Sequence, residues 1–403
     1  MQALIGEKLA QAKGLVAESG ADVWLTFVRE TAEGGDPVLP FLVEGALTWQ
    51  SALMVTAQGR CVAVVGNYDA EPLAAAGHWD EVVPYVQGIR APLLETLERL
   101  APDAGRKARI AVNVSTNDVK ADGLSHGMYL LLETYLQGTR FAGCLEPAEA
   151  ITLPLRGRKT LEETRRIRAA IEETDWLFNQ IGAFARVGRS EREVFDFVQG
   201  QIAARGLGYA WAATNDPIVN SGPDSMIGHG VPSAAITLAS GHILHVDLGV
   251  VREGYSSDMQ HCWYVPHPQE ARIPEDARRA MAAVTGALSA GAGALRPGVP
   301  GWQVDAAARR FLTEAGYPEY LHALGHQVGR VAHDGGGILG PRWERYGQTP
   351  EMPVELGQVY TLELGVMVEG RGYLGIEEMV QVTKDGCLWL TERQRDLPVL
   401  NEE

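Results

Sequence analysis

Cysteine is scarce in this 403-residue sequence, and its cysteines are far apart. There are four: Cys61, Cys144, Cys262 and Cys387. No two of them form a CxxC pair, so their spacing suggests neither a zinc knuckle nor a framework of disulfides. We expect all four to be reduced residues of the protein core.

The sequence also lacks long apolar runs and an excess of positive charge. No window approaches the roughly 20 apolar residues of a membrane span, and residues 1–20 alternate charged and apolar residues where a signal peptide would hold an apolar block. The formal net charge is −16, whereas nucleic acids and anionic membranes bind clustered Lys and Arg. We therefore expect a cytoplasmic protein that acts on a small molecule, with neither nucleic acid nor membrane as a partner.

The chain is long enough for two domains, because single cores stop growing near roughly 250–300 residues. Up to about residue 155, short β-rich runs such as ADVWLTFV and RCVAVVG alternate with helical stretches such as APLLETLERL. This alternation is typical of an α/β domain. We expect the boundary near residue 155, with one domain over residues 1–155 and a second over 156–403.

Two helix starts are expected at the beginning of the second domain. In TLEE, Thr160 precedes Glu163 by three residues, and in SERE, Ser190 precedes Glu193 by three. A Ser or Thr followed at this distance by Glu predicts a capping box, in which the two residues satisfy each other's free backbone N–H groups.

Two aspartates stand in a stretch that otherwise indicates two apolar strands. The runs HILHVDLGVV and YSSDMQHCWYV flank the turn signal REG, which predicts a β-hairpin. Without a bulge, Asp247 and Asp258 would be directly opposite, with Cβ atoms roughly 4.5–5.5 Å apart. Carboxylates this close cannot both stay ionised without a compensating charge, which a cation would supply. The alternative is that one is a turn residue and the other is solvated on an edge strand.

Histidines and glutamates downstream favour the cation. LHALGHQVGRVAHDGG holds His322, His326 and His333, and Glu363 and Glu377 each stand in an apolar, strand-like run. Charged residues in such runs are usually paired or metal-bound, because an isolated buried carboxylate is very costly. Two Asp, one His and two Glu suit two divalent ions of the manganese, cobalt or zinc type. Two ions about 3.5–4 Å apart can share a water and lower its pKa.

These motifs resemble those of the pita-bread metallopeptidases, which include methionine aminopeptidase, prolidase, aminopeptidase P and the metal-free creatinase. The family's DxG, GHxxG, TxE and IE[DE]xV elements correspond to DLG, GHQVG, TLE and IEEMV, and its second Asp follows the first by eleven residues, as here. The five matching metal-ligand positions are Asp247, Asp258, His326, Glu363 and Glu377. The resemblance implies an α/β (α+β) protein with a creatinase-like N-terminal domain followed by a pita-bread catalytic domain.

The resemblance also implies a role for each ligand. Asp247 would bind one ion through both oxygens, and Asp258 and Glu377 would bridge the two ions. His326 and Glu363 would complete the shell of the second ion. Glu363 would also take the proton from the bridging water and pass it to the leaving nitrogen.

Three histidines match substrate-contacting positions of the family with less specificity. His229, eighteen residues before Asp247, and His333, seven after His326, would hold the scissile carbonyl or the developing oxyanion. His322 matches a histidine typical of the prolidase branch. The alternative for each is a core or surface histidine with local hydrogen bonds. Four others match no role, and we expect only local hydrogen bonds for them: His242, His245, His261 and His267.

The implied activity is hydrolysis of the peptide bond before proline, as by an Xaa-Pro dipeptidase with manganese, or with cobalt or zinc. An Xaa-Pro aminopeptidase acting on longer peptides, a metallohydrolase of another amide, and a non-catalytic binding protein are the alternatives. The implied partner is a small peptide, and the implied assembly is a homodimer. A dipeptidase would also need a cation for the substrate carboxylate, for which Arg342, Arg345 and Arg371 are candidates alongside an ordinary surface role.

The chain departs from the family in segments that bear on specificity. Relatives have EPGxY where this chain has ELGVM, so Leu364 and Met367 replace Pro and Tyr. Gly375, in GIEE, replaces the arginine of the RIED element common in prolidases. In SDMQH, Gln260 and His261 replace the Thr and Arg of SDxTR, which alters hydrogen bonds to the metal ligands. We therefore expect an atypical specificity.

Overall fold

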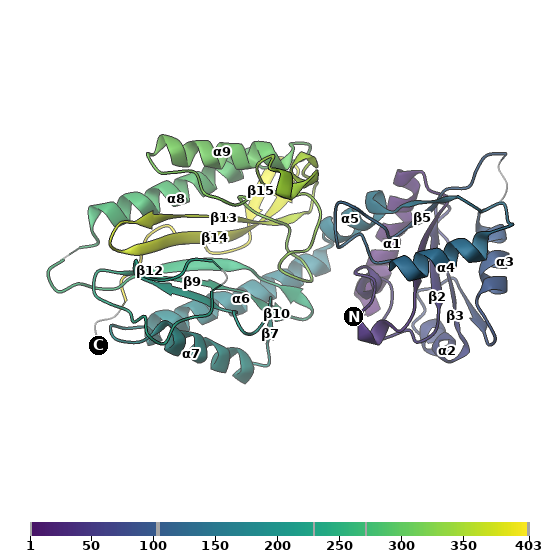
Figure 1. Cartoon of the computed structure of the whole chain (residues 1–403), viewed down its shortest axis with the longest axis horizontal. Coiled ribbons are helices and arrows are strands. Elements are labelled where there is room, and N and C mark those ends of the chain that lie inside the picture. The colour runs from purple at the N-terminus through teal and green to yellow at the C-terminus, as the bar shows by residue number, and fades with distance from the viewer. Residues whose placement is uncertain (1, 102–104, 229, 271, 401–403) are drawn as a thin grey trace. The chain divides into compact units, whose positions relative to one another are not determined.

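A computed structural model describes residues 2–101, 105–228, 230–270 and 272–400. It divides the chain into two compact units, residues 1–156 and 157–403 (Figure 1). Among the residues that it describes, no helix has the length and apolar character needed to cross a membrane.

The first unit is a mixed sheet of six strands with helices on both faces. The strand order is β4-β3-β2-β1-β5-β6, and β3/β4, β1/β5 and β5/β6 are the parallel pairs. The strands are β1 (Val23–Val28), β2 (Ser51–Thr56), β3 (Cys61–Gly66), β4 (Glu81–Tyr85), β5 (Ile110–Val112) and β6 (Leu145–Pro147). The helices are α1 (Gln2–Ser19), α2 (Asn67–Ala75), α3 (Arg90–Leu100), α4 (His126–Leu136) and α5 (Glu149–Gly157).

Strand β1 shows why the sequence of this unit is so apolar. Its odd-numbered residues enter the core beneath α3 and α4, whereas Trp24 and Val28 enter the core beneath α1 and α5. A strand that is buried on both faces reads as a continuous hydrophobic run rather than an alternating one. The α/β pattern predicted from the sequence is confirmed.

The second unit contains a larger, mainly antiparallel sheet and two helix pairs. The sheet has the order β13-β14-β12-β9-β8, with β15 paired to β14, and a second, small sheet has the order β11-β10-β7. Its strands are β7 (Gly208–Tyr209), β8 (Ile218–Ser221), β9 (Ile243–Leu248), β10 (Val250–Arg252), β11 (Tyr255–Ser256), β12 (Met259–Tyr264), β13 (Val359–Val368), β14 (Gly372–Thr383) and β15 (Gly386–Trp389). Its helices are α6 (Leu161–Phe184), α7 (Glu191–Ala204), α8 (Glu275–Ala294) and α9 (Gly301–Glu314).

The two helix pairs are built alike, and each lies against its own group of strands (Figure 1). Both second helices, α7 and α9, have 14 residues. Both connections turn through a left-handed glycine, Gly188 at φ 85° and Gly298 at φ 86°. Helix α6 contacts β10, β11 and β12, whereas α8 contacts β13, β14 and β15. The capping boxes predicted at the starts of α6 and α7 are both present.

The predicted register of the aspartate hairpin is wrong by two residues. Asp247 pairs with Gln260 rather than with Asp258. The reason is the turn: Arg252 pairs with Tyr255, so the two-residue loop is Glu253–Gly254, with φ of 51° and 77°. A two-residue loop with positive φ at both positions matches the right-handed twist of the two strands. A loop centred one residue earlier, on Arg252 and Glu253, would not have two such φ angles.

Candidate metal centre

The five predicted metal ligands come together in the second unit. Oxygens of Asp247, Asp258 and Glu377 lie within 4.8 Å of one another, and so do donor atoms of His326, Glu363 and Glu377. Asp247 comes from β9, Asp258 directly precedes β12, and the two glutamates face each other across β13 and β14. The structure thus gathers these residues from β9, the residue before β12, the loop that holds His326, β13 and β14, although their role as ligands stays a prediction.

The separations in this cluster are too long for hydrogen bonds. His326 Nε2 lies 3.6 Å from Asp258 Oδ2, 3.7 Å from Glu363 Oε1 and 3.9 Å from Glu377 Oε1. In addition, the buried oxygens Asp247 Oδ1 and Glu377 Oε1 have no hydrogen-bond partner within the described part of the chain. Donors at these separations fit around an ion that forms bonds of about 2.0–2.2 Å to nitrogen and oxygen.

The pKa shifts of the clustered side chains also indicate a site for cations. Burial raises the pKa of Asp247, Asp258 and Glu363, and the charge of Glu377 raises each of them further. Burial also raises the pKa of Glu377, to about 7. Burial lowers the pKa of His326 to about 3, with a smaller contribution from His333. A neutral imidazole cannot balance the four carboxyl groups, so their full ionisation requires cations.

Close contact between a loop and β13 positions His326. The His326 N–H donates to Thr361 Oγ1 at 3.2 Å, and the Thr361 N–H donates to the His326 carbonyl at 2.9 Å. Gly325 permits this approach, because a β-carbon there would lie 2.0 Å from the Thr361 carbonyl oxygen. The glycine of the GH motif is therefore required by the backbone contact rather than by a turn.

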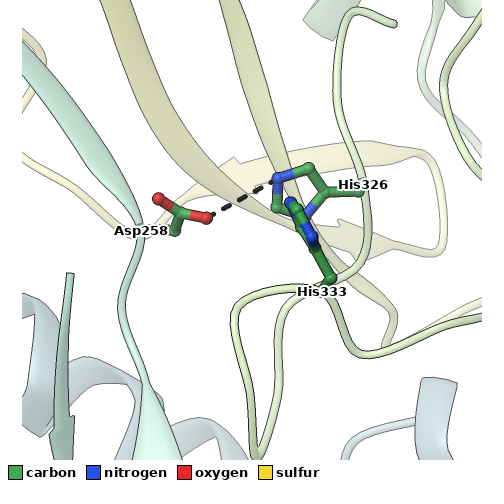
Figure 2. Close-up of side chains that lie close together, drawn as sticks. All are labelled: Asp258, His326 and His333. Atoms are coloured by element: carbon green, nitrogen blue, oxygen red, sulfur yellow. Dashed lines mark ion pairs between the residues drawn. The ribbon is translucent and has the colours of Figure 1, made fainter. Parts of the chain in front are cut away.

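The other predicted site histidines differ in their placement. His333 is exposed and meets His326 edge to face, with ring centroids 4.3 Å apart, and Asp258 lies across from His326 (Figure 2). His322 is in none of the ligand clusters found among the described residues, and its Nδ1 lies 2.7 Å from the Ala323 carbonyl oxygen. The predicted contact at His229 lies outside the described residues.

Comparison with known proteins places this chain in a family. Residues 165–384, more than half of the chain, match the model of Metallopeptidase family M24. The chain belongs to this family. The M24 chain is 31% identical over 244 residues to an Xaa-Pro dipeptidase of Pyrococcus furiosus, covering 60% of this chain and 65% of that one. It is 30% identical over 304 residues to the putative dipeptidase YkvY of Bacillus subtilis, covering 75% and 77%.

Solved structures show the same fold over nearly the whole length. A dipeptidase PepE from Mycobacterium ulcerans matches with a TM-score of 0.72 and 26% identity, covering 99% of the M24 chain and 98% of its own. An X-Pro aminopeptidase from Thermotoga maritima MSB8 matches with a TM-score of 0.68 and 23% identity, covering 98% and 99%. The predicted resemblance to the prolidase and aminopeptidase P branch is confirmed, as is the predicted fold class.

A chain of hydrogen bonds supports the proposed ligands of the M24 site, and the sequence predicts only its first member, Gln260. Gln260 Nε2 donates to Glu377 Oε2 at 2.8 Å and to Glu363 Oε2 at 3.3 Å. Its Oε1 lies 2.9 Å from His245 Nε2, and His245 Nδ1 lies 3.1 Å from Asn220 Oδ1. For His245 the sequence predicts only local hydrogen bonds. Its position two residues before Asp247 on a strand, hence on the same face, is the signal that could have revealed it.

Replacing Gln260 with Met should weaken manganese binding about 10- to 100-fold, the usual effect of removing a group that orients metal ligands. Met is similar in length but cannot donate to Glu363 and Glu377, whose carboxylates would then be free to rotate. Calorimetric titration of metal-stripped protein with Mn²⁺ measures the change. Gln303→Met, at an exposed position of α9, is the matched control, and an equal Kd for both variants would disprove the orienting role.

Proposed function

We propose that this M24 chain is a metal-dependent peptidase that cleaves the bond before proline, as an Xaa-Pro dipeptidase does. The observation that carries the proposal is the gathering of Asp258, Glu363 and Glu377 around His326, with Asp247 clustered against Asp258 and Glu377. The family membership and the names of its relatives support the reaction and the substrate. A small peptide is the proposed partner and the cytoplasm the proposed location. The proposed homodimer rests on the family resemblance.

The five clustered side chains would hold two divalent ions. We favour manganese, with cobalt or zinc as alternatives, because oxygen donors with a single imidazole suit these ions. When bound, such ions lower the pKa of a shared water and polarise the substrate carbonyl. The protein contributes the buried, prearranged donors, so that little reorganisation is needed during the reaction.

Glu363 is the proposed general base, and its exposure supports the choice. Its side chain is 20% exposed, whereas that of Glu377 is 2% exposed. Of the two facing glutamates, Glu363 is thus the one that a water molecule and a substrate can reach. It would accept the proton of the attacking water and return it to the leaving nitrogen.

The histidines would hold the substrate. His333, exposed beside His326, would donate a hydrogen bond to the substrate carbonyl or the oxyanion formed from it. Burial lowers the pKa of His322, and its Nδ1 faces a carbonyl oxygen, which can only accept. His322 is therefore a neutral ring whose Nε2 can accept a hydrogen bond from a substrate N–H group. His229 remains a proposed contact.

The arginines proposed for a substrate carboxylate are all engaged within the protein. Arg371 binds Glu270 at 3.1 Å and Asp276 at 2.9 Å, and Arg342 lies 2.6 Å from an oxygen of Glu351. Arg345 donates to the Leu321 carbonyl oxygen and to the Tyr346 hydroxyl. None of these three arginines is therefore assigned to the substrate carboxylate.

A panel of peptides tests the proposed function. Metal-stripped protein is assayed with and without Mn²⁺ on Ala-Pro, Ala-Pro-Ala and Ala-Ala, and released amino acids are measured by chromatography. We expect manganese-dependent release of proline from Ala-Pro and no cleavage of Ala-Ala. Cleavage of Ala-Pro-Ala but not Ala-Pro would identify an aminopeptidase. Binding of Mn²⁺ without cleavage of any peptide would favour the non-catalytic alternative.

A further inference from the structure

Two glycines face each other beside the two catalytic-site glutamates. Gly365 of β13 pairs with Gly375 of β14, two residues along from the pair formed by Glu363 and Glu377. Alternate residues of a strand share a face, so the glycines lie on the same face as the glutamates. Two residues beyond the glycines, Met367 pairs with Tyr373 on the same face of the sheet.

The side chain of Tyr373 covers both glycines. A β-carbon on Gly365 would lie 2.4 Å from the Tyr373 hydroxyl oxygen, and one on Gly375 would lie 2.4 Å from Tyr373 Cε1. Neither position could carry a larger residue while the ring stays in place. The ring also meets His245 edge to face, with centroids 5.0 Å apart and an interplanar angle of 89°. The glycine pair therefore allows Tyr373 to lie flat along the sheet towards the carboxylates.

The Tyr373 hydroxyl is a neutral donor that no described residue of the protein uses. Among the described residues it makes no hydrogen bond, and it is not sealed from solvent. A tyrosine hydroxyl has an ordinary pKa of about 10 and so is protonated at neutral pH, and burial raises the pKa of this one further. Solvent also reaches the same face at Met367, whose side chain is 52% exposed.

We propose that Tyr373 is a specificity-determining residue: its hydroxyl donates a hydrogen bond to an oxygen of the bound peptide, while its ring and Met367 form an apolar wall against the proline ring. This inference rests on the proposed function, because it takes the substrate to be a prolyl peptide. A neutral hydroxyl serves an amide carbonyl as well as a carboxylate. The substrate class is therefore prolyl peptides and prolyl amides alike, without a requirement for a free carboxylate at this position.

The experiment compares Tyr373→Phe with wild type on Ala-Pro and on its amide, Ala-Pro-NH₂. Losing one neutral hydrogen bond should raise KM about 3- to 10-fold for both substrates with little change in kcat. Manganese content and melting temperature should stay unchanged, since Phe keeps the ring over the two glycines. Tyr68→Phe, at an 81% exposed position of the first unit, is the matched control.

Three results would overturn the inference: an unchanged KM for both substrates, a fall in kcat at constant KM, or a loss of manganese. If wild-type protein cleaves neither substrate, the proposed function fails separately. The role of Tyr373 is then measured from the Kd of Ala-Pro in calorimetric titrations of manganese-loaded wild type and Tyr373→Phe. Equal Kd values would reject it, and a 3- to 10-fold weaker Kd for the variant would support it.

Discussion

Glu363→Gln should lower kcat about 10³-fold or more, while the protein remains folded. A positioned general base contributes typically 10²- to 10⁴-fold to a rate, and this change also removes the negative charge of a proposed metal ligand. The amide of Gln has the same size and can still accept from Gln260, so the surrounding strands should keep their arrangement. The measurement is kcat for Ala-Pro with manganese-loaded protein, together with circular dichroism and manganese content.

Glu378→Gln provides the matched control for this prediction. Glu378 follows the proposed ligand Glu377 in sequence, but its oxygens accept from Thr391 and the Gln394 N–H and lie in none of the described ligand clusters. Burial raises its pKa to about 7, so a neutral side chain is tolerated there. We expect Glu378→Gln to keep most of the activity. Substantial turnover by Glu363→Gln would refute the role of Glu363 as the base.

Removing the metal should make the protein progressively less stable as the pH rises. In the metal-free fold, burial raises the pKa of Glu377 to about 7, above the value of about 4.3 expected for an unfolded chain. Below pH 4 the carboxyl is protonated in both states, and its contribution to stability is fully present. Between about pH 4.3 and 7 the unfolded state releases the proton first, which costs about 1.4 kcal/mol of unfolding free energy per pH unit. Asp247, Asp258 and Glu363 shift in the same direction.

Thermal melts at pH 5 and pH 8, with and without Mn²⁺, measure this effect. The melting temperature of metal-free protein should be lower at pH 8, and the gain from Mn²⁺ should be larger there, because the ions stabilise the ionised carboxylates. Glu377→Gln should flatten the pH dependence of the metal-free protein. That variant separates the site from other buried carboxyls with raised pKa, such as Asp36 and Asp216. Metal-free melts that do not differ between the two pH values would contradict the prediction.

Features that depend on residues close in sequence, or on ordered motifs, could be predicted from the sequence. Features that depend on the exact geometry of a turn could not. The capping boxes at Thr160 and Ser190 depend on residues three apart, so the sequence contains everything needed to recognise them. Ordered motifs likewise identified five residues that the fold brings together. The hairpin register was mispredicted because a one-residue shift of the turn centre moves every pairing by two. Here the centre depends on Glu253, a non-glycine residue with positive φ.

The roles of Gln260 and Tyr373 could not be predicted for a different reason. Each role depends on residues of a neighbouring strand. Gln260 donates to glutamates more than 100 residues away in sequence. The side chain of Tyr373 extends over Gly365 of the neighbouring strand. A single sequence gives the strand of each residue and its face, but not the partner strand. The replacement of Thr by Gln at position 260 signalled only that hydrogen bonds near the ligands would change.

The matched helix pairs of the second unit bear on the order of folding. Asp247 and Asp258 follow α6 and α7, on β9 and directly before β12, and Glu363 and Glu377 follow α8 and α9, on β13 and β14. Each half therefore holds only two of the four proposed acidic ligands, and the proposed dinuclear site is complete only once β12 and β14 have paired. Ions bound between the two halves would stabilise the folded second unit but neither half alone. Metal uptake during refolding should therefore be a late event that reports the joining of the two halves.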